Sequence, residues 1–176
     1  FYLYAVLAPF FAVLFFPPGN ETAALLSAFA TYAAGFVVRP FGALLFGRIG
    51  DLVGRKYTFL ITIMVMGIST FAVGLLPTYA QIGWAAPILM VSLRLLQGLA
   101  LGGEYGGAAT YVAEHALNHR RGYDTAWIQT TATVGLFLAL VVIYTCRNTF
   151  DAKEFAEWGW RVPFWVSIFL LIFRSE

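Results

Sequence analysis

Charged residues are scarce in this 176-residue sequence: Asp, Glu, Lys and Arg together make up only 11%, whereas 60% of the residues are hydrophobic. A soluble globular domain carries roughly 25% charged residues, so a water-facing surface cannot be covered here. The composition excludes a soluble domain, and a mean hydropathy of +0.77 agrees. The only cysteine, Cys146, excludes an internal disulfide.

The sequence contains only two histidines, and their positions do not indicate a metal site. His115 and His119 are four residues apart, a spacing that suits zinc, but the glutamate of the metalloprotease motif is absent between them. No Ser/His/Asp set converges at one depth of the chain either. We therefore expect no metal, no cofactor and no enzyme activity.

Long hydrophobic runs are abundant. A transmembrane helix needs about 20 apolar residues, and the sequence contains six apolar runs, at residues 1–16, 21–46, 57–76, 86–113, 127–146 and 160–174. Barrel strands are about half as long and alternate in polarity, so we predict an all-α integral membrane fold with six transmembrane helices. The first run lacks a basic segment and a cleavage site, which favours a truncated membrane helix over a signal peptide. The chain is expected to be a fragment.

The basic residues predict the orientation. Loops that carry Lys and Arg face the cytoplasm, and here they follow the second and fourth runs: Arg48, Arg55, Lys56, Arg120 and Arg121. The N-terminus is therefore expected on the cytoplasmic side of the cell membrane. Tryptophans then fall at the two interfaces, with Trp84, Trp158 and Trp160 outside and Trp127 inside, as in an aromatic belt.

The first cytoplasmic turn, residues 47–56, has the sequence GRIGDLVGRK. Gly50 and Gly54 permit a tight reversal because glycine tolerates positive φ, and Asp51 and Arg55 would share a face if the segment is helical. An ordinary charged hairpin explains the segment equally well. A phosphate-binding loop is excluded, because Gly-Lys-Ser/Thr and a preceding strand are missing.

The fourth run is rich in regularly spaced glycine. Two series recur every four residues, a spacing that lets a neighbouring helix approach closely: Gly98, Gly102 and Gly106, and Gly103 and Gly107. We predict that these glycines pack against another helix.

Three ionisable residues lie at membrane depth: Arg39, Arg94 and Glu104. A charge there is costly and usually marks a substrate or ion path. Arg39 could instead snorkel to the cytoplasmic interface, which Arg94 can reach less easily. Glu104 is 280° around the helix from Arg94 at ~100° per residue, so the two are not stacked partners.

Four segments of the sequence together resemble a known family of membrane transporters. The turn 47–56 matches the G-x-x-x-D-x-x-G-R-K signature of the major facilitator superfamily, between its second and third helices. Three further segments resemble the superfamily's metabolite:proton symporters, such as the 2-oxoglutarate, proline/betaine and shikimate permeases: residues 39–42, 94–107 and 158–164. The resemblance implies a twelve-helix transporter of two halves, each built from two inverted three-helix repeats. This chain corresponds to the N-terminal half, and the C-terminal half is absent.

The resemblance also implies roles for individual residues. A cytoplasmic gate would comprise Gly47, Asp51, Gly54, Arg55, Lys56, Glu114 and Arg121. The substrate and proton pathway would comprise Arg94, facing a central cavity, with Gln97, Arg39 and Glu104, the last as a possible proton carrier.

The implied function is proton-coupled symport of a small organic acid or zwitterion, of the 2-oxoglutarate or proline/betaine type, by alternating access. An uncoupled facilitator and a non-transporting sensor on the same fold remain alternatives. The expected partners are a small-molecule substrate, protons, the lipid bilayer and the missing half of the polypeptide, and no nucleic acid.

Overall fold

The computed structural model describes residues 2–116 and 121–173, and every regular element in these ranges is helical. The elements are α1 (Tyr2–Phe15), α2 (Glu21–Val37), α3 (Arg39–Val53), α4 (Arg55–Leu75), α5 (Tyr79–Ile82), α6 (Ala85–His115), α7 (Arg121–Thr149), α8 (Ala152–Glu157), the 3-10 helix η1 (Gly159–Arg161) and α9 (Val162–Phe173). The predicted all-α fold is confirmed.

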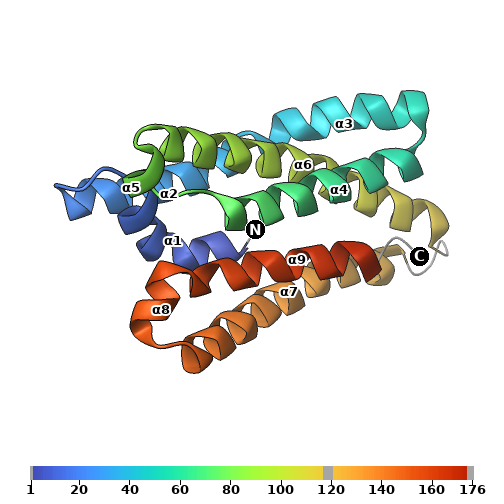
Figure 1. Ribbon diagram of the computed structural model, residues 1–176. Coiled ribbons are helices and arrows are strands. Elements are labelled where there is room, and N and C mark those ends of the chain that lie inside the picture. The colour runs from blue at the N-terminus through green and yellow to red at the C-terminus, as the bar shows by residue number, and fades with distance from the viewer. Residues whose placement is uncertain (1, 117–120, 174–176) are drawn as a thin grey trace.

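Four segments are long and apolar enough to cross a membrane: Glu21–Val53, Arg55–Leu75, Ala85–Ala113 and Gly122–Thr149. The apolar helices α1 and α9, with 14 and 12 described residues, are shorter. The long helices lie side by side, with α5 and α8 at one end and the α3–α4 turn at the other (Figure 1). We call these the α5–α8 end and the α3–α4 end.

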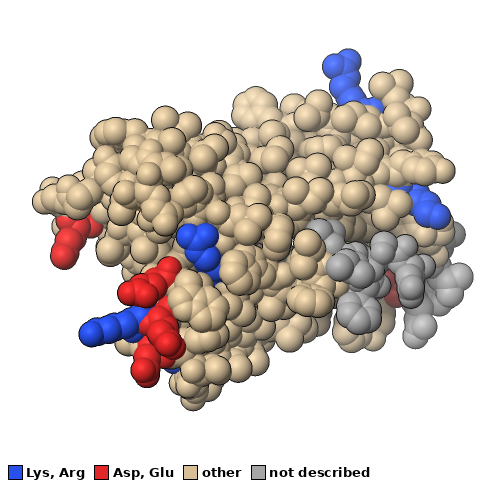
Figure 2. All heavy atoms as spheres, in the orientation of Figure 1, with Lys and Arg blue, Asp and Glu red and all other residues tan. Residues whose placement is uncertain are grey.

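On the face shown in Figure 2, the charged side chains gather at these two ends. Figure 2 shows a wide band without Lys, Arg, Asp or Glu across the middle of the visible face. Arg48, Asp51, Arg55 and Lys56 belong to the α3–α4 end, and Asp151, Lys153, Glu154 and Glu157 to the α8 segment. This distribution is the one that a lipid bilayer requires, because a charge in hydrocarbon is costly.

The predicted turn at residues 47–56 is mostly helix. Helix α3 continues to Val53, and α4 begins at Arg55, so the chain reverses at Gly54 alone, with φ of 106°. The prediction that Gly50 also shapes the reversal is wrong, because Gly50 is a helical residue of α3. One residue with positive φ suffices for the break.

Other boundaries also differ from the sequence prediction. Helix α7 begins at Arg121 rather than 127, and the stretch between the last two predicted runs, 127–146 and 160–174, contains the end of α7 and all of α8. Hydropathy places these helix ends too early or too late, because a helix longer than the membrane thickness continues into water with polar residues.

Helices α2 and α3 form one 33-residue span that is interrupted near its middle. The interruption lies at Val38. Arg39 follows it as the first residue of α3, and Pro40 lies in the first turn of that helix. Proline has no N–H to donate and crowds the preceding turn, so a kink is expected here. The helical hydrogen bonds resume at once, since the Gly42 N–H donates to the Val38 carbonyl at 3.1 Å.

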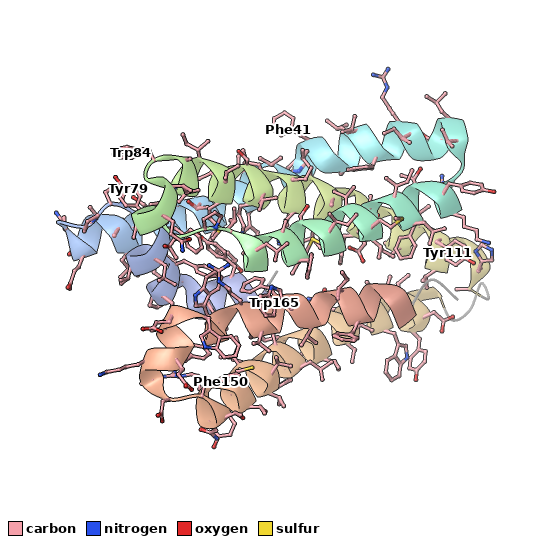
Figure 3. All side chains as sticks on the ribbon, in the orientation of Figure 1. Phe41, Tyr79, Trp84, Tyr111, Phe150 and Trp165 are labelled. Atoms are coloured by element: carbon pink, nitrogen blue, oxygen red, sulfur yellow. The ribbon has the colours of Figure 1, made fainter. Side chains whose placement is uncertain are left out.

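Aromatic side chains mark both surface and core. At the α5–α8 end, Tyr79 and Trp84 lie together with ring centroids 6.0 Å apart, and Tyr111 lies at the opposite end (Figure 3). Trp84, Trp127 and Trp158 are exposed. The prediction that Trp160 joins this belt is wrong, because Trp160 is 0% exposed.

Trp160 is instead part of the core of the α5–α8 end. Its ring makes edge contacts with Phe11 and Phe15 of α1, each at 5.5 Å between centroids. The next residue, Arg161, donates from Nη1 to the Gly74 carbonyl at 3.2 Å. A basic side chain thereby satisfies a carbonyl in the last turn of α4, and η1 is fixed against α1 and α4.

Candidate functional site

Arg94 of α6 is the centre of a buried polar network. It is 1% exposed, and its Nη1 donates to Oε1 of Gln97 at 2.5 Å. Gln97 Nε2 donates to the Thr70 hydroxyl of α4 at 3.2 Å, and that hydroxyl donates to the Met66 carbonyl at 2.7 Å. The sequence placed Arg94 beside a central cavity, but in the structure its guanidinium is enclosed by neighbouring side chains.

Two tyrosine rings complete the surroundings of Arg94. Its Cζ lies 4.3 Å from the ring centroid of Tyr4 and 5.0 Å from that of Tyr32. The two rings are stacked 6.0 Å apart, and the Tyr4 hydroxyl donates to the Ala28 carbonyl at 3.1 Å. Each such cation–π contact contributes ~0.5–2 kcal/mol, more when desolvated. Arg94 and its partner Gln97 thus join α6 to α1, α2 and α4.

A second guanidinium, that of Arg39, lies on the same row of rings. Its Cζ is 3.8 Å from the ring centroid of Phe36, and Phe36 meets Tyr32 edge-on at 5.0 Å. The row therefore runs Arg39, Phe36, Tyr32, Arg94. Arg39 is half-buried, and Phe36 is 40% exposed.

Arg39 has a specific ring contact near the middle of its span. The residue lies near the middle of its 33-residue span, roughly 20 Å from the α3–α4 end at ~1.5 Å per residue. The Arg39 guanidinium rests on the Phe36 ring, and snorkelling to the cytoplasmic interface stays an alternative.

Glu104 is not part of this cluster. It lies on α6 ten residues after Arg94, and therefore roughly 15 Å further along the helix. Its side chain is half-buried toward the α3–α4 end. The structure brings together Arg94, Gln97 and, through the rings, Arg39, but it leaves Glu104 apart from them.

The glycines of α6 divide into two groups. A Cβ at Gly98 would overlap the backbone of Gly35, and a Cβ at Gly102 would overlap the carbonyl of Arg39. A Cβ at Gly103 would lie 2.5 Å from Cβ of Phe46. Helix α6 therefore touches α2 and α3 backbone to backbone on both sides of the kink.

Gly106 and Gly107 have nothing within 4 Å of a built Cβ among the described residues. They border a groove of about 220 Å³ between α3, α4 and α6. The groove is lined by Ala43, Phe46, Gly47, Gly50, Asp51, Arg55, Thr58, Phe59, Gly102, Gly103, Gly106, Gly107 and Thr110. Gly106 and Gly107 therefore leave room for this groove, whereas Gly98, Gly102 and Gly103 allow close helix packing.

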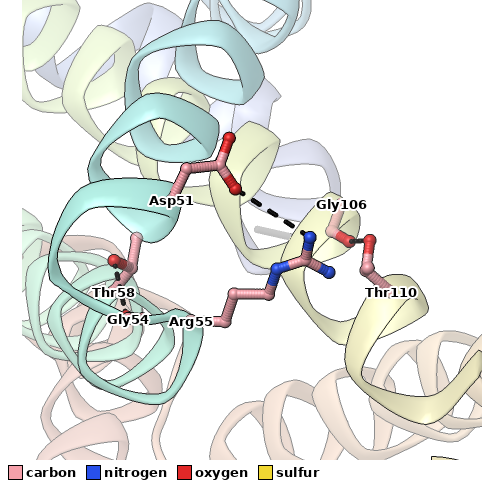
Figure 4. A network of polar contacts seen from close by, with 6 residues as sticks. All are labelled: Asp51, Gly54, Arg55, Thr58, Gly106 and Thr110. Carbon is pink, nitrogen blue, oxygen red and sulfur yellow. Dashed lines mark hydrogen bonds and ion pairs between the residues drawn. The ribbon is translucent and has the colours of Figure 1, made fainter. Parts of the chain in front are cut away.

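An ion pair spans the Gly54 break at the mouth of this groove. Arg55 Nη2 lies 3.9 Å from Asp51 Oδ1, and Figure 4 shows the Arg55 side chain extending toward α6 at Gly106 and Thr110. The Thr58 hydroxyl donates to the Gly54 carbonyl at 3.2 Å. The pair is exposed, with 74% of the Asp51 side chain and 39% of the Arg55 side chain accessible.

We expect Asp51→Asn to change the free energy of unfolding by less than about 1 kcal/mol, because exposed ion pairs contribute little. Thermal unfolding in detergent measures this directly. A destabilisation of several kcal/mol would show that Asp51 has a structural role that the exposed pair does not explain.

The remaining predicted gate residues are only partly described. Gly47 has no described atom within 4 Å of a built Cβ, and Lys56 is exposed. The side chains of Glu114 and Arg121 lie outside the described part of the structure, so their predicted pairing across the two loops stays a prediction.

Several site residues were not predicted from the sequence: Tyr4, Tyr32, Phe36 and Thr70. Tyr32, Phe36 and Arg39 follow the i, i+4, i+7 spacing of one helix face, and this signal was available. Nothing local marks Tyr4 or Thr70, which come from other helices, Tyr4 to contact Arg94 and Thr70 to contact Gln97.

Within residues 2–116 and 121–173, no group of three or more His, Cys, Asp or Glu side chains gathers as a metal site would. The His115 ring nitrogen Nδ1 lies 2.9 Å from the Tyr111 carbonyl. His119 lies outside the described residues.

Comparisons with known proteins relate this geometry to transporters. The alpha-ketoglutarate permease of Escherichia coli is 43% identical over 164 residues, which are 93% of this chain and 38% of that protein. The proline/betaine transporter of Salmonella typhimurium is 38% identical over 168 residues, which are 96% of this chain and 34% of that protein. The chain therefore spans less than half the length of these relatives, both of which are transporters rather than enzymes.

The fold comparison agrees. The solved structure of the major facilitator superfamily proton:xylose symporter XylE from E. coli matches with a TM-score of 0.81 at 20% identity, over 98% of this chain and 40% of that one. The model of the sugar (and other) transporter family matches residues 4–174. The chain therefore belongs to the sugar (and other) transporter family and has the fold of the major facilitator superfamily.

Proposed function

We propose that this chain is the N-terminal half of a twelve-helix, proton-coupled symporter for a small organic acid or zwitterion. The observation that carries the proposal is the buried Arg94 cluster, which places a fixed positive charge among four helices at membrane depth. Such a charge usually marks a substrate or ion path. The relatives that transport alpha-ketoglutarate or proline and betaine support the same class of solute.

In this proposal the Arg94 cluster links the binding of the solute to the relative positions of the helices. Tyr4, Tyr32 and Thr70 belong to three other helices, so a shift of any one of them changes the environment of the guanidinium. An anion near Arg94 is stabilised electrostatically and favours the arrangement that brings it closest. Glu104, half-buried on the same helix, is the proposed proton carrier.

The gate in this proposal is the Asp51–Arg55 pair beside the α3–α6 groove. An ion pair that forms in one state and breaks in another makes a two-state element. The pair bridges the single break between α3 and α4, so movement at Gly54 changes it directly. Glu114 and Arg121 would supply the matching charges of the next loop.

The α3–α4 end is proposed to face the cytoplasm, with the N-terminus on the same side of the inner membrane. Arg48, Arg55 and Lys56 gather there, as the positive-inside rule requires of a short cytoplasmic loop.

Uptake by the complete transporter in proteoliposomes tests the function. Labelled 2-oxoglutarate and proline are supplied with and without an inward proton gradient, and we expect the gradient to stimulate uptake of one of them. Uptake that a protonophore leaves unchanged would favour an uncoupled facilitator instead. Folded protein that takes up neither solute would favour the sensor alternative.

Arg94→Gln is expected to reduce gradient-driven uptake by about tenfold or more, because it removes the buried positive charge that attracts an anion and that holds Tyr4, Tyr32 and Gln97 together. Arg94→Lys keeps the charge without the planar fork and should retain part of the activity. Gel filtration in detergent establishes that both variants are folded. Unchanged uptake by folded Arg94→Gln would remove Arg94 from the pathway.

A further inference from the structure

The hydrogen bonds that connect Arg94 to α4 run in one direction. A guanidinium has N–H donors and no acceptor, so the Gln97 side chain must turn its carbonyl oxygen toward Arg94. Arg94 Nη1 accordingly donates to Gln97 Oε1. The amide nitrogen of Gln97 is then directed away from Arg94, toward α4. The charge of Arg94 therefore determines how this amide is oriented.

Thr70 of α4 accepts a hydrogen bond from that amide nitrogen. Gln97 Nε2 donates to the Thr70 hydroxyl at 3.2 Å, and the hydroxyl in turn donates its own proton to the Met66 carbonyl at 2.7 Å. A hydroxyl can donate one hydrogen bond and accept others at the same time. Gln97 is 2% exposed and Thr70 is 8% exposed, so bulk water has little access to replace the Thr70 hydroxyl if it is removed.

Helix α4 is itself held in place one turn after Thr70. Gly74 packs so closely against α9 that a built Cβ would lie 2.9 Å from Cβ of Phe164 and 2.9 Å from Cδ1 of Trp165. Arg161 Nη1 also donates to the Gly74 carbonyl at 3.2 Å. Thr70 therefore belongs to a well-anchored part of α4, and the hydrogen-bond chain connects this part of the helix to the guanidinium of Arg94.

Resting on the proposed function, we propose that Thr70 is a positioning residue for solute binding, which acts through Gln97 to fix the direction in which Arg94 presents its guanidinium. A guanidinium recognises a carboxylate by its planar geometry as well as by its charge, so a change of direction weakens binding even though the charge is kept. Without the Thr70 hydroxyl, a buried N–H of Gln97 loses its partner, which is costly. A rotation of Gln97 toward another acceptor would also withdraw Oε1 from Arg94.

Uptake kinetics of the complete transporter in proteoliposomes test this role, with labelled 2-oxoglutarate or proline, whichever the wild type takes up. Thr70→Val keeps the shape of the side chain and removes the hydroxyl. We expect it to raise KM by about fivefold to tenfold with little change in the maximal rate, because a buried donor is left without its acceptor. Thr70→Ser keeps the hydroxyl and should keep KM within about twofold of the wild type.

The matched control is Thr62→Val on the same helix. Thr62 is 0% exposed, and its hydroxyl donates to the Phe59 carbonyl of its own helix at 2.8 Å. This control removes an equally buried hydroxyl and should leave KM within about twofold of the wild type. A loss of folded protein lowers the maximal rate, whereas KM does not depend on the amount of active protein. The comparison of KM therefore separates a positioning role from a merely structural one.

A double-mutant cycle tests whether Thr70 acts through Gln97. Gln97→Met keeps the length of the side chain and removes both of its hydrogen-bonding groups, so it should itself raise KM. In that background we expect Thr70→Val to have no further effect on KM, because the connection is already broken. Additive effects of the two substitutions would mean that Thr70 acts by another route, and the positioning role through Gln97 would be wrong.

The outcomes separate the two proposals. If the wild type shows gradient-driven uptake but folded Thr70→Val has the same KM as Thr62→Val, the positioning role is wrong and the transport function stands. A Thr70→Ser variant as impaired as Thr70→Val contradicts the role of the hydroxyl in the same way. If Thr70→Val does not fold, an unchanged KM in Gln97→Met overturns the positioning role. A wild type that takes up neither solute overturns the proposed function, and the positioning role with it.

Discussion

Replacing Trp160 by alanine is expected to lower the free energy of unfolding by about 3–5 kcal/mol, the usual cost of truncating a buried Trp. The Trp160 side chain is 0% exposed, and its ring contacts those of Phe11 and Phe15 on α1 and Phe164 on α9. Alanine would leave a cavity where three elements meet. Each lost aromatic pair adds ~0.5–1.5 kcal/mol beyond the buried area.

The measurement is thermal unfolding of the complete transporter in detergent, followed by tryptophan fluorescence or by gel filtration after heating. The matched control is Trp158→Ala, two residues away, which removes an exposed ring whose aromatic contact is with Phe150 at 4.8 Å. We expect a much smaller shift in Tm for the control. Equal shifts would mean that burial does not distinguish the two tryptophans.

Gly102→Ala and Gly98→Ala are expected to destabilise the protein by about 1–3 kcal/mol or more, because overpacking a close contact forces the backbone to move. The added methyl groups would overlap backbone atoms of Arg39 and Gly35, and a backbone cannot change rotamer to make room. Helix α6 must therefore separate from α2 and α3. The same separation would displace Arg39 and Arg94 from their rings.

Gly106→Ala is the control for these variants, because it adds the same methyl group to the same helix. No atom of the residues that the structure describes lies within 4 Å of a built Cβ at Gly106, and Ala is more favourable than Gly in a helix by roughly 1 kcal/mol. Its Tm should be unchanged or slightly raised. A loss in Gly106→Ala as large as that in Gly102→Ala would show that α6 needs flexibility rather than close packing.

The helices were predictable because the thickness of the bilayer imposes an apolar run on each of them. The same signal fails where a helix continues into water, and for this reason the turn at 47–56 proved to be mostly helix around a single break at Gly54. Trp160 was misplaced for a related reason. An aromatic residue near a membrane interface has the same sequence environment whether its ring faces lipid or the core.

The polar cluster around Arg94 was predictable from the sequence only in part. Arg94 and Gln97 stand out because they are polar residues in an apolar helix, and they contact each other one turn apart. Tyr4 and Thr70 come from helices distant in sequence, and aromatic or hydroxyl residues are ordinary in a membrane helix. The contacts that enclose Arg94 are tertiary, so no local pattern contains them.

The lengths of the helices divide the polar sites into two environments. At ~1.5 Å per residue, the 33-residue α2–α3 span and the 31-residue α6 measure roughly 45–50 Å, against ~30 Å of hydrocarbon. Their ends therefore project into the aqueous layer, and the Asp51–Arg55 pair lies there among mobile counter-ions with a Debye length of about 8 Å at physiological salt. Arg94, which is 1% exposed, is shielded from such ions by the side chains around it. Ionic strength therefore screens the Asp51–Arg55 pair more strongly than the buried charge of Arg94, so a salt series can distinguish the proposed gate from the proposed pathway around Arg94.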